Sequence, residues 1–314
     1  MNKLLIILSN PKFAWNRLYY KFLSRLIPDS IYLRIEFRKR VGYPLNLRNP
    51  QTYNEKLQWL KLHDRNPQYV QLVDKFEVRD YVKHTIGEEF LIPLIGVFDK
   101  VEDIEYNRFP HQFVLKPTHS SGDVVICRNK SKLDIKKAND YLNKRMKNNL
   151  FWSGREWPYK NIKPRIICEE LLINDSQDDL VDYKILCFNG VPKCLFLCLD
   201  RRSESGLKVD FYDLDWNPLP FERHYPRSGK IIEKPACFNE MLDLSRKLSK
   251  DIPFVRVDFY IVNNQIKFGE LTFFPGSGFE EFTPESYDYL LGSWIDLSLV
   301  EKNQKEDANV RKVR

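Results

Sequence analysis

The sequence predicts a fold of the α+β class, with mixed α/β elements, on two observations. Short strand-like runs occur in antiparallel pairs joined by turns, and helical stretches lie between the pairs rather than after every strand. Hydrophobic residues make up 43% of the 314 residues, which excludes a generally disordered chain and allows one large domain or two modest ones. A regular parallel βαβ series is therefore not expected.

The first elements are helical. Thr52 and Glu55 have the spacing of a capping box, so a helix is expected to begin at Thr52. A second helical stretch is expected after Pro67, ending near Gly87, because glycine often follows the last turn of a helix. Residues 90–98 form a short apolar run between turn residues, which predicts a strand.

The middle of the chain contains a hairpin. Residues 112–116 and 124–127 are expected to be strands, and the small residues 118–123 between them indicate a flexible loop. A charged helix at residues 134–148 and a strand at 165–172 should follow.

Two further hairpins are predicted by asparagine-containing turns. Asn189-Gly190 is the strongest short-range hairpin signal in the chain, and Asn263-Asn264 marks the second turn. The expected elements are strands at 183–188, 192–199 and 207–213, a helix at 238–249, strands at 254–262 and 265–273, and a helix at 285–297.

The net charge of +7 and the pI of about 8.9 first suggest a nucleic-acid or anionic-membrane partner. Residues 1–48 alone carry +8, whereas residues 49–300 carry −3. The basic segment interleaves apolar residues at helical spacing, which leaves two interpretations open: residues 1–40 contact an anionic membrane, or the segment packs on the body as a solvated helix. No nucleic-acid recognition motif is present, so no nucleic-acid partner is expected.

The longest early apolar run, residues 4–8, is too short to span a membrane or to serve as a signal peptide. We therefore expect a cytoplasmic protein that contacts the inner face of a membrane at most peripherally.

The last hairpin carries a group of charged residues. Arg256 and Asp258 share one face of their strand, and pairing across the turn brings the region of Glu270 beside them. A protein usually supplies two carboxylate ligands to Mg²⁺, and water and phosphate oxygens complete the coordination. A structural arginine–carboxylate cluster is the alternative.

The earlier hairpin places Lys116 at the mouth of its loop. Ser120, Ser121 and Gly122 would let backbone N–H groups approach a phosphate, although the spacing is not that of a Walker A motif. An ordinary hairpin turn is the alternative. Among the five histidines, His119 inside this loop is the one worth testing.

Five motifs in this order resemble the ATP-grasp superfamily, and most of all its TupA-like branch, which is associated with teichuronopeptide and capsular or other surface-polysaccharide biosynthesis. The motifs are VDKFEVR at 73–79, VLKPTHSSG at 114–122, CEELL at 168–172, DYKILCFNG at 182–190 and RVDFY…FGELTFFPGSG at 256–278. The resemblance implies two α+β subdomains that grip ATP between antiparallel sheets, behind a basic helical N-terminal extension.

The resemblance also implies a division of the chain. The expected parts are the extension at 1–48, an N-terminal ATP-grasp region at 49–110, a small subdomain with the phosphate loop at 111–172, a C-terminal subdomain with the Mg²⁺ site at 173–300 and a charged tail at 301–314.

Site residues follow from the same motifs, and the cofactors that they imply are ATP and Mg²⁺. Lys75 and Lys116 would contact nucleotide phosphates, Ser120, Ser121 and Gly122 would form the loop over them, and Glu169, Glu170, Leu171 and Leu172 would bind adenine and ribose. Lys184 and Arg256 would be catalytic, and Asp258, Glu270 and Thr272 would be the metal ligands, with Thr272 standing where the superfamily usually has Asn or Asp.

The implied activity is an ATP- and Mg²⁺-dependent carboxylate–amine ligase that forms an acyl phosphate. Its partners would be a uronic-acid-type glycan or glycan precursor, which supplies the carboxylate, and an amino acid or other amine. The alternative is a glycosyltransferase that uses a nucleotide-sugar, with Asp178-Asp179 or Asp213 and Asp215 as its metal-binding pair. A nucleic-acid-binding protein is the remote third hypothesis.

Overall fold

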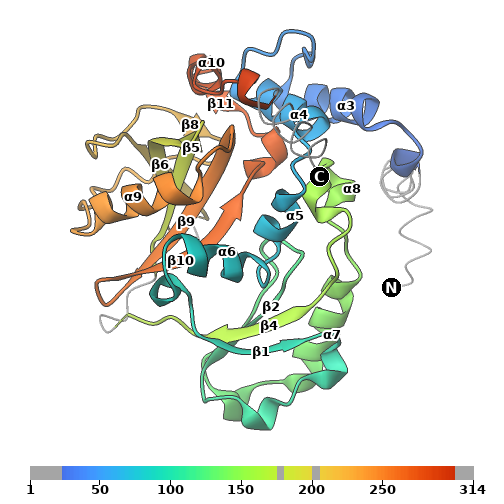
Figure 1. Cartoon of the computed structure of the whole chain (residues 1–314), viewed down its shortest axis with the longest axis vertical. Coiled ribbons are helices and arrows are strands. Elements are labelled where there is room, and N and C mark those ends of the chain that lie inside the picture. The colour runs from blue at the N-terminus through green and yellow to red at the C-terminus, as the bar shows by residue number, and fades with distance from the viewer. Residues whose placement is uncertain (1–22, 175–179, 200–205, 301–314) are drawn as a thin grey trace, which may run out of the picture.

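The computed structural model describes residues 23–174, 180–199 and 206–300. Within them, three antiparallel sheets and the helices around them form a mixed α/β fold, which confirms the predicted class (Figure 1). The four-stranded sheet has the order β1-β4-β2-β3 and the five-stranded sheet the order β10-β9-β5-β6-β7. The strands are β1 (Leu94–Phe98), β2 (Phe113–Pro117), β3 (Val125–Cys127), β4 (Ile166–Glu170), β5 (Asp182–Phe188), β6 (Val191–Leu199), β7 (Lys208–Tyr212), β9 (Phe254–Val262) and β10 (Gln265–Thr272), with β8 (Glu222–Arg223) and β11 (Phe282–Thr283) in a two-stranded sheet.

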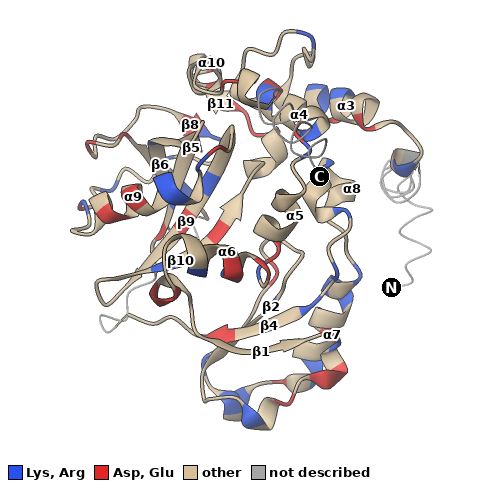
Figure 2. Cartoon of the chain, in the orientation of Figure 1, with Lys and Arg blue, Asp and Glu red and all other residues tan. Residues whose placement is uncertain are grey.

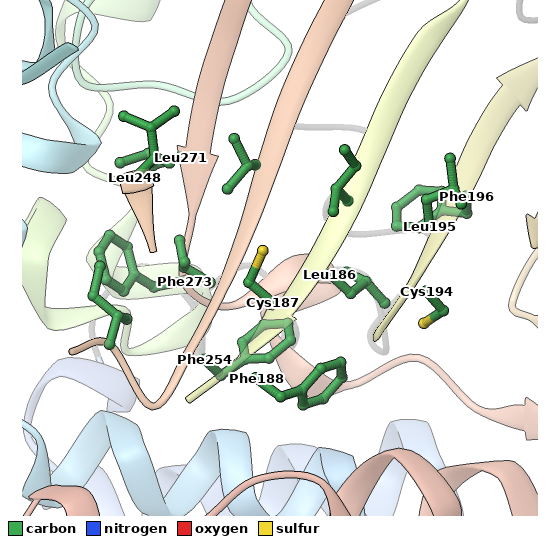
Figure 3. Close-up of a cluster of buried hydrophobic side chains, with 14 of the residues drawn as sticks. Leu186, Cys187, Phe188, Cys194, Leu195, Phe196, Leu248, Phe254, Leu271 and Phe273 are labelled. Carbon is green, nitrogen blue, oxygen red and sulfur yellow. The ribbon is translucent and has the colours of Figure 1, made fainter. Parts of the chain in front are cut away.

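Each larger sheet has its own apolar core. Phe113 and Leu115 of β2 pack with Leu142 of α7 (Ile135–Met146) beneath the four-stranded sheet. The larger core lies on the five-stranded sheet, where Figure 3 shows Phe188 and Phe254 of neighbouring strands close to each other. Helix α9 (Phe238–Leu248) contacts β5, β6 and β9 and contributes to this core.

The two asparagine turns form as predicted. Asn189 and Gly190 have φ of 52° and 79°, and Asn263 and Asn264 have φ of 49° and 63°. Both turns therefore use the left-handed region that asparagine and glycine tolerate, and they join β5 to β6 and β9 to β10. Local turn chemistry thus sets the register of each hairpin next to its turn.

The prediction of a single helix after Pro67 is wrong. The structure contains α5 (Gln68–Val73) and α6 (Val78–Thr85), with a break between them. Asp74 Oδ1 accepts hydrogen bonds from the backbone N–H groups of Phe76 and Glu77, at 2.8 and 3.0 Å. The side chain of Asp74 thereby starts a new turn, and Lys75 lies half-buried in this turn rather than on a helical face.

Two other boundaries also differ from the prediction. The strand expected from residue 90 begins only at Leu94, because residues 88–90 form a 3-10 turn and Pro93 has no N–H to donate to a ladder. The last predicted helix is shorter, since α10 covers Ser286–Ser293. Beyond it, the carbonyl of Trp294 and the N–H of Asp296 bond to the side chain of Asn189, at 2.7 and 3.0 Å, and this tertiary contact takes the chain out of the helix.

The basic N-terminal segment is described from residue 23 onward. Helix α3 (Asp29–Val41) packs on the body through Tyr32, Leu33 and Phe37, which form a small core with Phe279. Residues 1–22, which contain most of the predicted amphipathic pattern, lie outside the described residues, as does the tail at 301–314. The division of the chain into subdomains stays a prediction.

Helix α4 (Tyr53–His63) begins with the predicted capping box, in which Thr52 Oγ1 accepts from the N–H of Glu55 at 3.1 Å. Replacing Thr52 with Ala should lower the free energy of unfolding by about 1 kcal/mol, because it leaves a helical N–H unsatisfied. Thr52→Ser keeps the hydroxyl and should stay close to the wild type. Urea unfolding measures both, and an equal loss in the two variants would contradict the capping role.

Candidate functional site

Charged side chains form a row across three strands of the five-stranded sheet. In the observed register Asp258 of β9 pairs with Lys184 of β5 on one side and with Glu270 of β10 on the other. Directly paired residues project from the same face of a sheet. Arg256 lies two residues from Asp258 on β9 and therefore shares that face.

Glu270 reaches this face because β10 contains a bulge at Gly269. Phe268 pairs with Phe259 and Glu270 pairs with Asp258, so Gly269 is the extra residue in β10. A simple continuation of the register would instead pair Glu270 with a residue on the opposite, apolar face. A Cβ atom on Gly269 would lie 3.1 Å from the carbonyl oxygen of Asp258, which favours glycine here.

Arg256 holds both carboxylates of the row. Its Nε and Nη2 donate to the two oxygens of Asp258, each at 2.6 Å, and Nη2 also donates to Glu270 Oε1 at 2.7 Å. Lys184 Nζ donates to Asp258 and lies 2.7 Å from Asp182 Oδ2. Thr272 Oγ1 donates to Glu270 Oε1 at 2.8 Å. The structure thus brings together all five residues that the sequence predicted for catalysis and metal binding.

Burial and pairing shift the pKa values of the two carboxylates in opposite directions. Burial raises the pKa of Asp258, against the opposing effect of Arg256 and Lys184. Burial alone would also raise the pKa of Glu270, but Arg256, Lys75 and Lys184 together lower it to about 2. Glu270 is therefore ionised at neutral pH and available to a cation.

The donor set fits Mg²⁺ only if other ligands complete it. In the described ranges, no three His, Cys, Asp or Glu side chains lie close enough to hold a metal ion. Asp258 and Glu270, however, both contact the same guanidinium nitrogen, so one cationic group reaches both carboxylates. Mg²⁺ often takes one or two carboxylates and completes its shell with water and phosphate oxygens. The residues present match that chemistry, and Thr272 orients Glu270.

A second charged group lies on the four-stranded sheet. Lys116 Nζ is 2.8 Å from Glu169 Oε2, and Arg79 Nη1 is 3.1 Å from Glu169 Oε1. Arg79 is the last residue of the motif VDKFEVR and is a charged residue of this group that was not predicted from the sequence. The signal that could have identified Arg79 as a site residue is its positive charge within that motif.

Lys75 connects the two charged groups. Its backbone N–H donates to the carbonyl of Thr118 at 3.1 Å, and its Nζ donates to the carbonyl of Ser120. Burial lowers the pKa of Lys75, Glu270 opposes that shift, and Lys116 adds to it. Lys75 therefore lies within electrostatic range of Glu270 on one sheet and of Lys116 on the other.

The loop after β2 contains hydroxyl groups that have no partner. Thr118 Oγ1 and Ser120 Oγ are buried, and neither has a hydrogen-bond partner among the described residues. Buried polar atoms normally find partners, so such donors beside two lysines indicate a place for an anion. Ser121 and Gly122 are exposed, and Gly122 has φ of +73°. His119 is buried, and burial lowers its pKa.

The remaining predicted residues follow Glu169 along the chain. Glu170 is exposed, and its N–H donates to the carbonyl of Pro93 at 3.1 Å. Leu171 and Leu172 are half-buried and lie just beyond the end of β4. The structure thus directs Glu169, but not Glu170, toward the charged group.

A family model described as TupA-like ATPgrasp matches residues 55–296, more than half of the chain. The chain belongs to the TupA-like ATP-grasp family. This result confirms the resemblance that the five motifs indicated. A search of curated proteins found no match.

Solved structures that the comparison found include two ligases and a synthetase. The D-alanine–D-alanine ligase of Helicobacter pylori is 14% identical, with a TM-score of 0.41 over 77% of this chain and 69% of that one. The ATP-grasp ligase PsnB, solved with a phosphomimetic variant of its minimal precursor, Mg and ADP, is 9% identical, with a TM-score of 0.38 over 70% and 57%. The D-cycloserine synthetase DcsG is 14% identical, with a TM-score of 0.39 over 72% and 74%. The chain therefore aligns with little more than half of PsnB.

The carboxylates of the glycosyltransferase hypothesis are placed differently. Asp213 Oδ1 accepts from the N–H groups of Asp215 and Asn217, at 2.9 and 2.8 Å, so Asp213 stabilises a surface turn. Asp178 and Asp179 lie outside the described residues.

The lowered pKa of Glu270 predicts a pH dependence of stability. Its pKa in the folded chain, about 2, lies below its ordinary value of 4.5, so the unfolded chain binds more protons between these values. The stability that Glu270 contributes is present above about pH 4.5 and is lost as the pH falls toward 2. The difference in unfolding free energy between the wild type and Glu270→Gln should therefore narrow as the pH falls.

Denaturant unfolding at several pH values between 5 and about 2.5 measures this difference. Glu240→Gln, at an exposed position on α9, is the matched control and should run parallel to the wild type. A constant difference for Glu270→Gln across this range would show that its carboxylate is not held in the ionised form.

Proposed function

We propose that this protein is an ATP- and Mg²⁺-dependent ligase that joins a carboxylate to an amine. The observation that supports this most directly is the position of Lys75, which binds the loop with the unpartnered hydroxyls and lies within electrostatic range of Glu270. Phosphoryl transfer depends mainly on positioning and on neutralising charge, and the charged residues around Lys75 suit that task.

The nucleotide would lie between the two larger sheets. Lys75, Lys116 and the hydroxyls of Thr118 and Ser120 would bind its phosphates, because these groups are cationic or lack partners. The segment from Glu169 to Leu172 would bind the adenosine. Asp258 and Glu270 would hold Mg²⁺, which neutralises phosphate charge when it is bound.

Arg256 and Lys184 would serve the reaction as fixed positive charges. Burial and the charge of Arg256 would lower the pKa of Lys184, but Asp258 and Asp182 raise it overall. Lys184 therefore stays protonated and is unsuited to act as a base. Arg256 would steady the phosphoryl group while a carboxylate oxygen of the acceptor attacks the γ-phosphorus and ADP leaves.

The second half-reaction would consume the acyl phosphate. The amine attacks the acyl carbon, the C–O bond to phosphate breaks, and the products are an amide, inorganic phosphate and a proton. The family likeness supports a uronic-acid-type surface glycan or its precursor as the acceptor, with an amino acid or another amine as the co-substrate. The reaction would then take place on the cytoplasmic side of the membrane.

Removing either metal-binding carboxylate should abolish the activity. With ATP, Mg²⁺, D-glucuronate and hydroxylamine, the wild type should release ADP and form a hydroxamate, because hydroxylamine traps an acyl phosphate. Asp258→Asn and Glu270→Gln should each slow ADP release by about 100-fold or more. Coupled measurement of ADP and colorimetric measurement of the hydroxamate follow both products.

Two controls separate chemistry from folding in this experiment. Glu240→Gln should keep full activity because Glu240 is exposed on α9. Thermal-shift measurements should show that ATP with Mg²⁺ stabilises the wild type, whereas UDP-glucose does not. Full activity in both carboxylate variants, or stabilisation by UDP-glucose alone, would contradict the ligase.

We further propose that α3 contributes to a peripheral membrane contact. None of the helices in the described part of the chain is long and apolar enough to span a bilayer. Helix α3 nevertheless exposes Ile31 and Ile35, at 48% and 46%, and the cations Arg34 and Arg38 on the same helix are exposed as well. Figure 2 shows basic residues along α3. Exposed isoleucines flanked by arginines are suited to the interface of an anionic membrane.

Replacing both isoleucines with serine should reduce co-sedimentation with vesicles that contain phosphatidylglycerol, and deleting residues 1–22 should reduce it further. A deletion of residues 1–40 would also remove Tyr32 and Phe37 from a buried core, so the truncation stops before α3. The matched control replaces Tyr289 and Leu290, which are exposed on α10, with serine. Equal binding to neutral phosphatidylcholine vesicles would contradict an electrostatic contact.

A further inference from the structure

Arg223 is a buried arginine whose hydrogen-bonding capacity is only partly used. It lies on β8 with 5% of its surface exposed. Its Nε is 3.0 Å from Glu280 Oε2, within ion-pair distance, but neither Nε nor Nη1 has a hydrogen-bond partner among the described residues. A buried guanidinium nitrogen without a partner is costly, so its presence calls for a functional reason.

Arg223 lies beside the charged row described above. Its guanidinium carbon is 4.9 Å from the ring centroid of Phe196, and that of Arg256 is 5.8 Å from the same centroid. Phe196 pairs in register with Lys184, which places its ring on the face that carries the charged row. The two guanidinium groups therefore share one aromatic neighbour.

Glu280, which pairs with Arg223, lies in the segment that follows β10. The carboxyl group of Glu280 occupies the space next to Gly276, where an added Cβ would lie 2.1 Å from its Cδ. Gly276 belongs to the turn Pro275–Gly278 and has φ of +58°, a conformation that glycine adopts readily. The turn begins three residues after Thr272, so the Arg223–Glu280 pair adjoins the strand of the candidate metal ligands.

A second unpartnered donor lies in the same region. The hydroxyl of Tyr53 on α4 is buried and has no hydrogen-bond partner in the described part of the chain. Burial raises the pKa of Tyr53, Arg223 and Arg256 both oppose this shift, and Glu280 adds to it. The phenol therefore lies within electrostatic range of both arginines.

We propose that Arg223, together with the hydroxyl of Tyr53, binds the carboxylate of the acceptor next to Arg256. This inference rests on the proposed ligase function and adds the residues that recognise its acceptor. A carboxylate has the lone pairs to satisfy both donors, and a guanidinium binds it with directed hydrogen bonds. Glu280 already neutralises part of the charge of Arg223, so a singly charged carboxylate suits this place better than a phosphate.

The test is equilibrium binding of D-glucuronate, with neutral D-glucose as the matched ligand, to the protein saturated with ADP and Mg²⁺. Titration calorimetry should show that the wild type binds D-glucuronate more tightly than D-glucose. Arg223→Gln should weaken D-glucuronate binding by about tenfold or more, and Arg223→Lys by less, without changing ADP binding. Arg227→Gln, an exposed arginine of the same segment, should match the wild type.

Tyr53→Phe is a second variant that tests the proposal even if the arginine variants do not fold. It removes only an oxygen atom that has no hydrogen-bond partner among the described residues, so the melting temperature should be retained while D-glucuronate binding weakens. Unchanged binding of D-glucuronate in both Tyr53→Phe and Arg223→Gln would overturn the proposal. So would equal binding of D-glucuronate and D-glucose by the wild type.

The two proposals can fail separately. If Arg223-dependent binding of D-glucuronate is found but no hydroxamate forms, the acceptor site stands and the ligase chemistry fails. If hydroxamate forms and Arg223→Gln leaves the KM for D-glucuronate unchanged, the ligase stands and Arg223 is only structural.

Discussion

The contact of Arg256 with Asp258 and Glu270 is the interaction on which the arrangement of this site depends. Arg256 and Asp258 lie on β9 inside the sheet and Glu270 on the adjacent edge strand β10, and all three groups are largely buried, so unpaired charges there would be strongly destabilising. Lys184 and Asp182 extend the pairing on one side, and Lys75 extends it on the other. Three cations and three carboxylates then balance, so a polyphosphate that enters this site would need to bring a cation of its own.

The same constraint explains two irregularities in the backbone. The bulge at Gly269 moves Glu270 onto the face of Arg256, and without it the carboxylate would point into the apolar core. The break at Asp74 separates α5 from α6 and lets Lys75 bond to the loop after β2. Each irregularity costs regular hydrogen bonds, and each brings one charged side chain into the site. Lys75 thereby links the loop of the four-stranded sheet to the charged row, whereas the apolar cores of the two sheets are separate.

The parts of the structure that could be predicted from the sequence are those that local chemistry determines. Asn189-Gly190 and Asn263-Asn264 adopt left-handed turns because asparagine and glycine tolerate positive φ, and Thr52 forms the cap of α4 with Glu55, three positions away. The bulge at Gly269 and the end of α10 at Ser293 depend on contacts with distant residues, so no local pattern revealed them. Arg223 was missed for the same reason, because its neighbours Phe196 and Glu280 are far from it in the sequence. Motif order located the site, but only the register showed which side chains meet there.

The two arginines beside Phe196 differ in a way that separates their roles. Arg256 uses Nε and Nη2 on the carboxylates of the charged row, so its orientation is fixed before any ligand binds. Arg223 forms an ion pair with Glu280, but among the described residues neither its buried Nε nor its buried Nη1 has a hydrogen-bond partner. Leaving such a group unsatisfied costs about 1–3 kcal/mol, which a carboxylate ligand would recover on binding. A fixed arginine suits the transferred phosphoryl group, whose position must not change, and a partly unsatisfied one suits an acceptor that has to enter and leave.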